Sequence, residues 1–247
     1  MPSFPAVTAG TDEAHPVFVA ARQVARAASA WHRARLEGLE YLPPGPALLI
    51  GNHGLFGLET LVFFYLLHRH TGRVPVGMTD RRVFGKTPMR QVLFKVGGVP
   101  GTRENGVAAL RAGRWVVCYP GGAHEVFKSP ESRYRLAWDR ASGFAKLAIE
   151  ANVPVVPFAG LGVDDTFVNL GHAPLTKALL GRYAAPVAFG VGPLPLPVQL
   201  RFCFSSPITP ARARRDPRRL KSLVQAAVEE LLEGHGRAAP TAVPAIP

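Results

Sequence analysis

The stretch Ala-Leu-Leu-Ile-Gly-Asn-His-Gly-Leu-Phe-Gly-Leu-Glu, residues 47–59, decides the fold. Its first four residues are a short continuous apolar run, which is typical of a strand buried on both faces of a sheet. Gly51, Asn52 and His53 end that strand, and the residues from about 58 to 69 predict a helix directly after it. A buried strand that leads straight into a helix is the building unit of α/β proteins with a parallel sheet.

The rest of the chain alternates strands with helices in the same way. The apolar pattern predicts further strands at 74–78, 115–119, 153–158 and 198–204, and further helices at 89–96, 104–111, 139–151 and 217–233. We therefore expect an α/β layered domain with a mainly parallel sheet flanked by helices, as a single domain over residues 15–236. Its parts are an N-terminal amphipathic helix at about 15–37, a core at about 38–210 and a C-terminal helix at about 217–234, with loose tails at 1–14 and 237–247.

Composition narrows the class of protein. Of the 247 residues, 47% are apolar and 19% are charged, which excludes a disordered or fibrous protein. The formal net charge of +12 indicates an anionic partner: a nucleic acid, a membrane surface or a phosphorylated substrate. No basic strand with interleaved aromatic residues and no helix-turn-helix pattern stands out, so we do not expect nucleic-acid binding. The N-terminus lacks the pattern of a signal peptide, and prolines interrupt the uncharged run at 183–200, so we expect no membrane-spanning helix.

The N-terminal helix has two interpretations. Apolar residues at positions 17, 20, 24, 27, 31 and 34 repeat at helical spacing, and Arg22, Arg26 and Arg33 fall on the opposite face. Such a helix usually packs its apolar stripe on the domain. A basic amphipathic helix can instead lie in a membrane interface. The pattern alone leaves both interpretations open.

His53 stands where the first buried strand ends, and α/β proteins bind their ligands at such ends. Glu59 follows six positions later, in the first turn of the next helix. A carboxylate there can reach back to the imidazole, fix its tautomer and stabilise the imidazolium that forms when the histidine accepts a proton. The two residues also fit a structural interpretation, in which His53 caps the strand and Glu59 complements the helix N-terminus.

Two Gly-rich turns follow later strands. The first, at 97–103, ends in Arg103, whose guanidinium can clamp an anion next to backbone N–H groups. The second contains Gly121 and Gly122, whose backbone N–H groups can approach a substrate carbonyl or phosphate. Glu125 follows three residues later. Both turns are candidate binding elements, although most turns of this kind have no such role.

The sequence does not predict a metal site or a disulfide. His124 and Glu125 have no ligand spacing with His53 and Glu59 that resembles a known metal motif, so we expect no bound metal. Cys118 and Cys203 lie in apolar runs that are typical of strands, where a buried reduced thiol is the expected state.

Four segments in order, NHGLFGLE, GGVPGTREN, YPGGAHE and VPVVPFAGLGVDDTF, resemble the motifs of the glycerolipid acyltransferase superfamily. The resemblance covers about residues 36–210. Pro-Gly-Gly followed by Ala-His-Glu is most similar to the diacylglycerol acyltransferases and to the acyltransferase domain of phytyl ester synthases. The resemblance implies a parallel-sheet α/β domain that associates with membranes and uses acyl-CoA or acyl-carrier protein. His53 occupies the position of the family's catalytic histidine.

Three positions depart from the common family pattern. Leu58 stands where most members have an aspartate, and the acid here is Glu59, one position later and one methylene longer. Pro100 replaces an aromatic residue of the second motif, whereas Arg103 matches its terminal arginine. Pro-Gly-Gly stands where the phospholipid-making branch has Pro-Glu-Gly, and this favours a neutral hydroxyl acceptor over lysophosphatidate.

The resemblance implies an acyltransferase that moves a fatty acyl group from a thioester donor to a lipid hydroxyl. His53 would be the general base and Glu59 would orient it, with no cofactor other than acyl-CoA or acyl-carrier protein as co-substrate. The candidate substrate-binding residues are Asn52, Arg103, Gly121, Gly122 and Glu125. We expect an anionic membrane surface as partner, and a cytoplasmic location at the inner face of the membrane. Two alternatives stay open: an acyl thioesterase or esterase on the same fold, and a catalytically silent lipid-binding protein.

Overall fold

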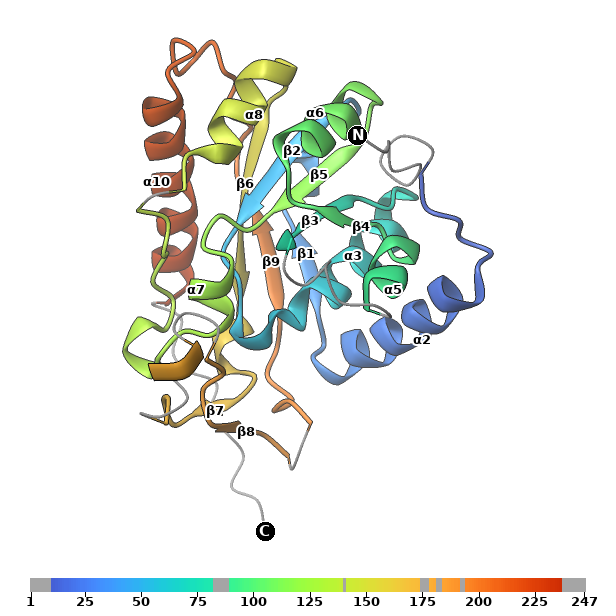
Figure 1. The fold of residues 1–247 in the computed structure, drawn as a ribbon, viewed down its shortest axis with the longest axis vertical. Helices are drawn as coiled ribbons and strands as arrows, with labels where there is room; N and C mark the ends of the chain where they lie inside the picture. Colours follow the sequence, from blue (N-terminus) through green and yellow to red (C-terminus); the bar gives the residue numbers. More distant parts are fainter. Residues whose placement is uncertain are drawn as a thin grey trace.

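The structure, a computed structural model, describes residues 10–81, 89–139, 141–173, 178–180, 184–191 and 194–236. A seven-stranded sheet lies between two layers of helices (Figure 1). The strands are β1 (Arg35–Glu37), β2 (Ala47–Gly51), β3 (Val76–Thr79), β4 (Gly98–Pro100), β5 (Trp115–Cys118), β6 (Val155–Leu161), β7 (Val168–Asn169), β8 (Ala188–Phe189) and β9 (Arg201–Phe204). Of the predicted tails, residues 1–9 and 237–247 lie outside the described residues.

The helices alternate with the strands along the chain. The α-helices are α2 (Pro16–Trp31), α3 (Glu59–Thr71), α5 (Met89–Lys95), α6 (Arg103–Arg111), α7 (Ala123–Val126), α8 (Gly143–Ala151) and α10 (Pro217–Gly236). Short 3-10 helices are η1 (Leu39–Tyr41), η2 (Leu55–Gly57), η3 (Pro130–Ser132) and η4 (Val163–Asp165). None of the helices within the described ranges is long and apolar enough to cross a membrane.

The strand order of the large sheet is β1-β9-β6-β2-β5-β3-β4. Five neighbouring strands of this sheet are parallel to one another: β6, β2, β5, β3 and β4. The strand β9 is antiparallel to β6, and β1 is parallel to β9. The predicted mainly parallel α/β sheet is confirmed. Because β9 and β1 are reversed, their amino ends lie at the same edge of the sheet as the carboxyl ends of β2, β5 and β6.

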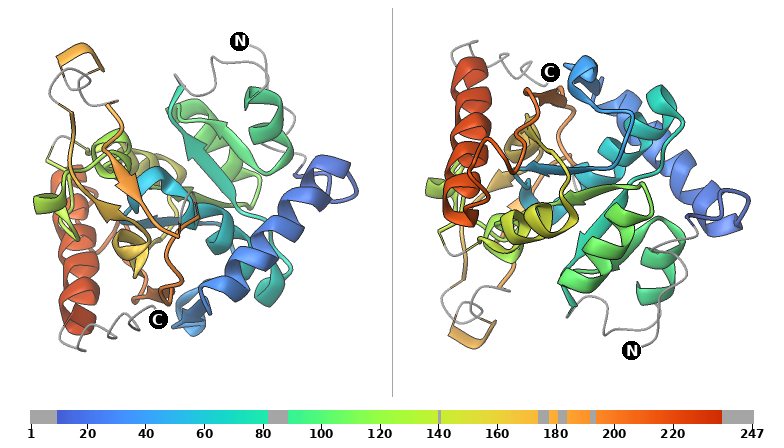
Figure 2. Two further views of the ribbon diagram at one scale, coloured as in Figure 1. Left: turned by 90° about the horizontal axis from the view of Figure 1, so that it is seen from below. Right: turned by 90° about the horizontal axis from the view of Figure 1, so that it is seen from above.

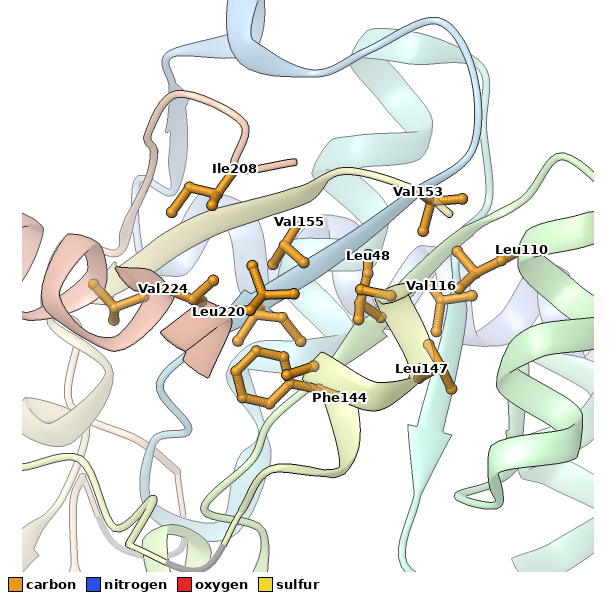
Figure 3. Packing of buried hydrophobic residues seen from close by; sticks show 14 of the residues in the cluster. Leu48, Leu110, Val116, Phe144, Leu147, Val153, Val155, Ile208, Leu220 and Val224 are labelled. Carbon is orange, nitrogen blue, oxygen red and sulfur yellow. The ribbon is translucent and has the colours of Figure 1, made fainter. Parts of the chain in front are cut away.

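β2 lies in the middle of the sheet and is buried on both faces, as its apolar run predicted. Leu48 and Ile50 belong to the hydrophobic core on the side of α6, α8 and α10, and Leu49 belongs to the core on the side of α3. Figure 3 shows Leu48 packed in the core on the side of α6, α8 and α10, together with side chains such as Phe144 of α8. The central position of β2 fixes where the loop after it, which carries His53, begins.

Several predicted boundaries were wrong. The N-terminal helix ends at Trp31 instead of continuing to about 37, and residues 35–37 form strand β1. Residues 98–100, predicted as part of a turn, form strand β4. Both strands are three residues long and lie at the edges of the sheet, where a short segment carries little apolar pattern. The strands β7 and β8 and the helix α7 were not predicted.

The apolar stripe predicted for the N-terminal helix faces outward. α2 buries Phe18, Ala25 and Ser29 against the domain, whereas Val24 and Trp31 of the predicted stripe are 60% and 41% exposed. Packing of that stripe on the domain is therefore wrong. Ala25 and Ser29 are small, and together with Phe18 they form the face of the helix that packs on the domain next to α3.

Candidate active site

The loop after β2 is tied to the neighbouring strand by Asn52. Its side-chain amide donates to the carbonyl oxygen of Gly160 at 3.0 Å and accepts from the Gly160 N–H at 2.7 Å. Gly160 lies in β6, and Asn52 is buried. The residue predicted to bind substrate therefore uses both of its polar atoms to hold the start of the His53 loop against the sheet.

His53 and Glu59 are in direct contact, as their spacing predicted. The Nδ1 atom of His53 lies 2.5 Å from Oε1 of Glu59, and the N–H of Gly54 donates to the same oxygen at 3.1 Å. Burial raises the pKa of Glu59, but the charge of His53 and the bonds from His53 and Gly54 outweigh burial and leave that pKa lowered. The ionised carboxylate accepts a hydrogen bond from the Nδ1–H group, so Nε2 is the nitrogen available to accept a proton from a substrate.

Gly57 allows the loop to pass close to the imidazole. Its backbone φ is +68°, and a Cβ atom there would lie 2.8 Å from Cε1 of His53, closer than van der Waals contact permits. The preceding Phe56 also has a positive φ, of 61°. This tight turn folds the chain back so that Glu59, the first residue of α3, can reach His53.

Tyr119 covers one face of the His53 ring. The two ring centroids are 4.0 Å apart and the planes differ by 12°, which is a stacked arrangement. Tyr119 directly follows β5, the neighbour of β2 in the sheet. The carboxyl ends of two adjacent parallel strands therefore hold the imidazole between them, and the ring cannot turn without displacing Tyr119.

The peptide groups on both sides of the His53 side chain are held by buried charged residues. The His53 N–H donates to Oε2 of Glu125 at 2.7 Å, and the N–H of Ala137 donates to Oε1 of the same carboxylate at 3.0 Å. Nζ of Lys128 donates to the His53 carbonyl oxygen at 2.9 Å. Glu125 is fully buried, and each of its two oxygens accepts a hydrogen bond from a backbone N–H group. This arrangement favours a role in holding His53 over the predicted contact with a substrate.

Lys128 is balanced by Asp164. Its ammonium group lies 2.9 and 3.0 Å from the two carboxylate oxygens, and both side chains are buried. The N–H of Tyr134 also donates to Asp164, at 2.6 Å. Burial raises the pKa of Glu125 and of Asp164, although the charge of Lys128 acts to lower both. We call Glu59, Glu125, Lys128 and Asp164 the polar support of His53.

The remaining predicted site residues divide into two groups. Gly121 lies against the polar support, because a Cβ there would be 2.2 Å from Cδ of Glu125. The N–H of Gly122 donates to the carbonyl oxygen of Tyr119 at 3.1 Å, so the turn itself uses it. Arg103 lies at the start of α6 and pairs with Glu150 of α8 on the surface, a contact outside the group around His53.

Sequence reasoning missed Lys128, Asp164 and Tyr119. Asp164 lies in the quoted segment that ends in VDDTF, which was the available signal for it. Lys128 has no local signal, since only the fold brings it to His53, 75 positions earlier. Tyr119 was expected in a buried strand and was given no role at the site.

An apolar cavity of about 250 Å³ begins beside His53. Gly57, where an added Cβ would meet the His53 ring, and Thr60 line it near the loop that carries His53. The cavity is bounded by α2, α3, α5, β3 and β4, through residues that include Phe18, Ala21, Leu61, Phe64, Leu93 and Val96. Its lining is mostly apolar, so it suits a hydrocarbon chain better than a charged group. Among the residues that the structure describes, no group of three His, Cys, Asp or Glu side chains could hold a metal ion.

Residues 33–160, just over half of the chain, match the family model described as Acyltransferase. The chain belongs to this family. The predicted resemblance to the glycerolipid acyltransferases is confirmed, and the match spans the loop that carries His53, the Gly-rich turns and β6 up to Gly160. The dyad of His53 and Glu59 is thus part of an acyltransferase domain.

Curated relatives of this chain include proteins named "DGAT1/2-independent enzyme synthesizing storage lipids". The Bos taurus protein is 32% identical over 212 residues, which are 85% of this chain and 62% of the relative. The Homo sapiens protein is also 32% identical over 212 residues, with 85% of this chain and 64% of the relative covered. This chain therefore spans less than two thirds of the length of these relatives.

Two further proteins are similar to this chain, one in sequence and one in structure. An uncharacterized protein of Mycobacterium tuberculosis is 27% identical over 191 residues, with 73% of this chain and 53% of the relative covered. The crystal structure of the 1-acyl-sn-glycerophosphate acyltransferase PlsC from Thermotoga maritima has a TM-score of 0.58 at 15% identity and covers 90% of this chain and 80% of its own. At this identity the likeness concerns the fold.

Proposed function

We propose that this acyltransferase transfers a fatty acyl group from a thioester donor to a lipid hydroxyl, with His53 as general base. The observation that carries the proposal is the 2.5 Å contact between Nδ1 of His53 and the Glu59 carboxylate, next to an apolar cavity. The names of the curated relatives, which refer to the synthesis of storage lipids, support a lipid product.

The dyad accounts for the proton transfers of the reaction. Nε2 of His53 accepts the proton of the acceptor hydroxyl as its oxygen attacks the thioester carbonyl carbon. The new C–O bond forms and the C–S bond breaks, and the imidazolium then returns the proton to the thiolate that leaves. Glu59 stabilises the imidazolium between these two transfers.

Transfer is direct, without an acyl-enzyme. Cys118 is the cysteine nearest in sequence to the site, and burial together with the charge of Glu125 raises its pKa to about 12. A thiol with such a pKa stays protonated at neutral pH and is a poor nucleophile. A stable acyl adduct on Cys118 or on a serine would contradict direct transfer.

The apolar cavity is proposed to hold the fatty acyl chain of the donor. Acyl-CoA or acyl-carrier protein would present the thioester to His53 at the end of the cavity lined by Gly57 and Thr60. Arg103, matched with the terminal arginine of the family's second motif, is proposed to contact phosphate groups of the donor or the acceptor. Its exposed pairing with Glu150 leaves it within reach of a ligand from solvent.

A membrane is proposed as the source of the acceptor. The net charge of +12 favours association with an anionic lipid surface, such as the inner face of a cell membrane. The acyltransferase would then act as a peripheral membrane protein on the cytoplasmic side, and its acceptor would be a lipid alcohol held in that membrane.

The deciding experiment incubates the purified protein with acyl-CoA and a panel of acceptors: diacylglycerol, lysophosphatidate and a long-chain alcohol. Ester formation and thiol release are followed together. His53→Ala should lower turnover by about 10²–10⁴-fold, because it removes the general base, and Glu59→Gln should lower it in the same direction. His124→Ala, at an exposed histidine of α7, is the matched control and should retain turnover.

Two results would contradict the proposal. Full turnover in His53→Ala would remove the general base from the mechanism. Thiol release without any ester, at a rate independent of every alcohol, would make the protein a thioesterase.

A further inference from the structure

The two-stranded ribbon β7–β8 presents apolar side chains to the surface. Val168 lies opposite Phe189, and Leu170 donates its N–H to Val187. Alternate residues of a strand point to the same face, so these four side chains share one face of the ribbon. All four are exposed, with Leu170 the most exposed at 64%. Monomeric proteins rarely leave such a cluster without a partner.

The opposite face of the ribbon rests on the active site. Asn169, between the two outward residues of β7, donates from its side chain to the carbonyl oxygen of Lys128 at 2.9 Å. Lys128 in turn holds the carbonyl oxygen of His53. Phe167, just before β7, meets Phe56 of the catalytic loop edge to face, with 5.3 Å between the ring centroids. The apolar face is therefore fixed next to the loop that carries His53.

The end of α2 continues the same surface. Trp31 donates its indole N–H to the carbonyl oxygen of Pro195 at 3.0 Å, and Arg33 donates to that of Pro197 at 3.0 Å. Leu196 donates its N–H to Thr166, which leads into β7. Both segments lie at the edge of the sheet where β2 ends, and Figure 2 (left) looks onto this side of the molecule. We define the docking rim as Trp31, Leu170, Val187, Phe189, Val191 and Leu194, which are 41–64% exposed.

The charge of the two segments is of one sign. Residues 16–34 and 166–200 contain no Asp and no Glu, and their basic residues are Arg22, Arg26, Arg33, Lys177 and Arg182. Each Lys or Arg near an anionic lipid surface adds to the attraction between the protein and the membrane. Exposed apolar side chains, a tryptophan and basic residues without acidic ones are the composition of segments that enter a membrane interface.

We infer that the docking rim inserts into the surface of an anionic bilayer and so brings His53 to the lipid. The inference deepens the proposed function, since it rests on a lipid acceptor for the reaction and names the surface through which that acceptor is reached. A second copy of the chain is the less favoured occupant, because two molecules that each carry a charge of +12 repel one another.

The test is flotation of the full chain with vesicles of phosphatidylcholine alone and of phosphatidylcholine with phosphatidylglycerol, in the absence of substrate. Wild-type protein should float with the anionic vesicles, and less so in high salt. Leu170→Ser/Phe189→Ser should lower that association by about tenfold or more, because two large apolar side chains no longer enter the interface. Both side chains are exposed, so the thermal midpoint should stay that of the wild type.

Tyr41→Ser is the matched control. Tyr41 is an exposed aromatic residue in η1, before β2, at the edge of the sheet opposite His53. This variant should float like the wild type. Equal flotation of the wild type and Leu170→Ser/Phe189→Ser would overturn the inference, as would equal flotation with neutral and anionic vesicles. A wild-type dimer that the same double variant converts to a monomer would assign the rim to a second copy and would also overturn it.

The outcome is separable from that of the catalytic proposal. His53→Ala should float as the wild type does, and the rim variant should keep its turnover with a water-soluble short-chain acceptor. Loss of catalysis in the first without loss of flotation supports both proposals. A wild type that floats but makes no ester contradicts the proposed function and leaves the docking surface standing.

Discussion

His53 separates two environments of opposite character. On one side lies the polar support. Glu59 binds the imidazole of His53, Glu125 accepts from the His53 N–H, and Lys128, paired with Asp164, donates to the His53 carbonyl oxygen. On the other side lies an apolar cavity of about 250 Å³ with little polar surface. Under the proposed function, the polar side would orient the general base and the apolar side would select the acyl chain that lies beside it. Substitutions on the two sides should therefore have separable effects.

The largest effect is expected on the polar side. Lys128→Met leaves the Asp164 carboxylate buried without its cation, and loss of one partner of a buried ion pair costs about 3–5 kcal/mol of unfolding free energy. The variant should also lose turnover, because the His53 carbonyl oxygen loses its donor. Urea denaturation measures the first effect, and an acyl-transfer assay below the transition measures the second.

A control and a rescue sharpen this prediction. Lys146→Met, at an exposed lysine of α8, should change stability by less than about 0.5 kcal/mol. Lys128→Met combined with Asp164→Leu removes both charges and should recover part of the stability, but not the turnover. If Lys128→Met unfolded at the same urea midpoint as the wild type, the polar support would not stabilise the fold.

The apolar side should respond in selectivity instead of stability. Ala21 lines the cavity from α2, and Ala21→Leu would fill part of its volume. We expect turnover with long-chain acyl-CoA to fall by about tenfold relative to a short-chain donor, since the space for several methylene groups is lost. Ala30→Leu, at an exposed position of the same helix, should leave this ratio unchanged. An unchanged ratio in Ala21→Leu would place the acyl chain elsewhere.

The smallest effect is a change in how stability depends on pH. The pKa of Glu125 is raised by burial, so the folded protein keeps this proton at pH values where the unfolded chain, with a pKa near 4.5, has lost it. The unfolding free energy that this carboxyl contributes is fully present below pH 4.5, and it is lost as the pH rises through the pKa of Glu125 in the folded protein. Glu125→Gln does not titrate. The stability of the wild type relative to this variant should therefore decrease as the pH rises above 4.5, as measured by thermal unfolding over a pH series.

A constant offset between the two proteins does not affect this prediction. Glutamine supplies one acceptor oxygen where the carboxylate accepts from two N–H groups, so the variant is less stable by an amount that does not depend on pH. Parallel stability curves for Glu125→Gln and the wild type would mean that Glu125 stays ionised in the folded protein throughout the range.

The sequence allowed the sheet and the dyad to be predicted because both depend on local pattern. The run from Ala47 to Ile50 has the pattern of a strand buried on both faces, and a loop of five residues with two glycines between His53 and Glu59 suffices for the contact that forms. Neither required knowledge of distant parts of the chain. The catalytic use of that contact stays a prediction.

The polar support and the orientation of α2 could not be predicted. Lys128 and Asp164 are 36 positions apart, and only the completed sheet brings them together beneath His53. An apolar stripe on a helix has the same pattern whether it faces a core or a bilayer, so the positions of Val24 and Trp31 in the sequence did not show which side they face. The short strands β1 and β4 depend on their neighbours in the sheet more than on their own residues.

The pairing of β1 with β9 has a consequence for the order in which the molecule is assembled. Glu37 of β1 binds Arg201 of β9, 164 positions later in the chain. At a synthesis rate of about 5–20 residues per second, β1 waits roughly 10–30 s for its partner strand. The helix α2, which precedes β1, therefore leaves the ribosome well before the sheet that it lies beside is complete.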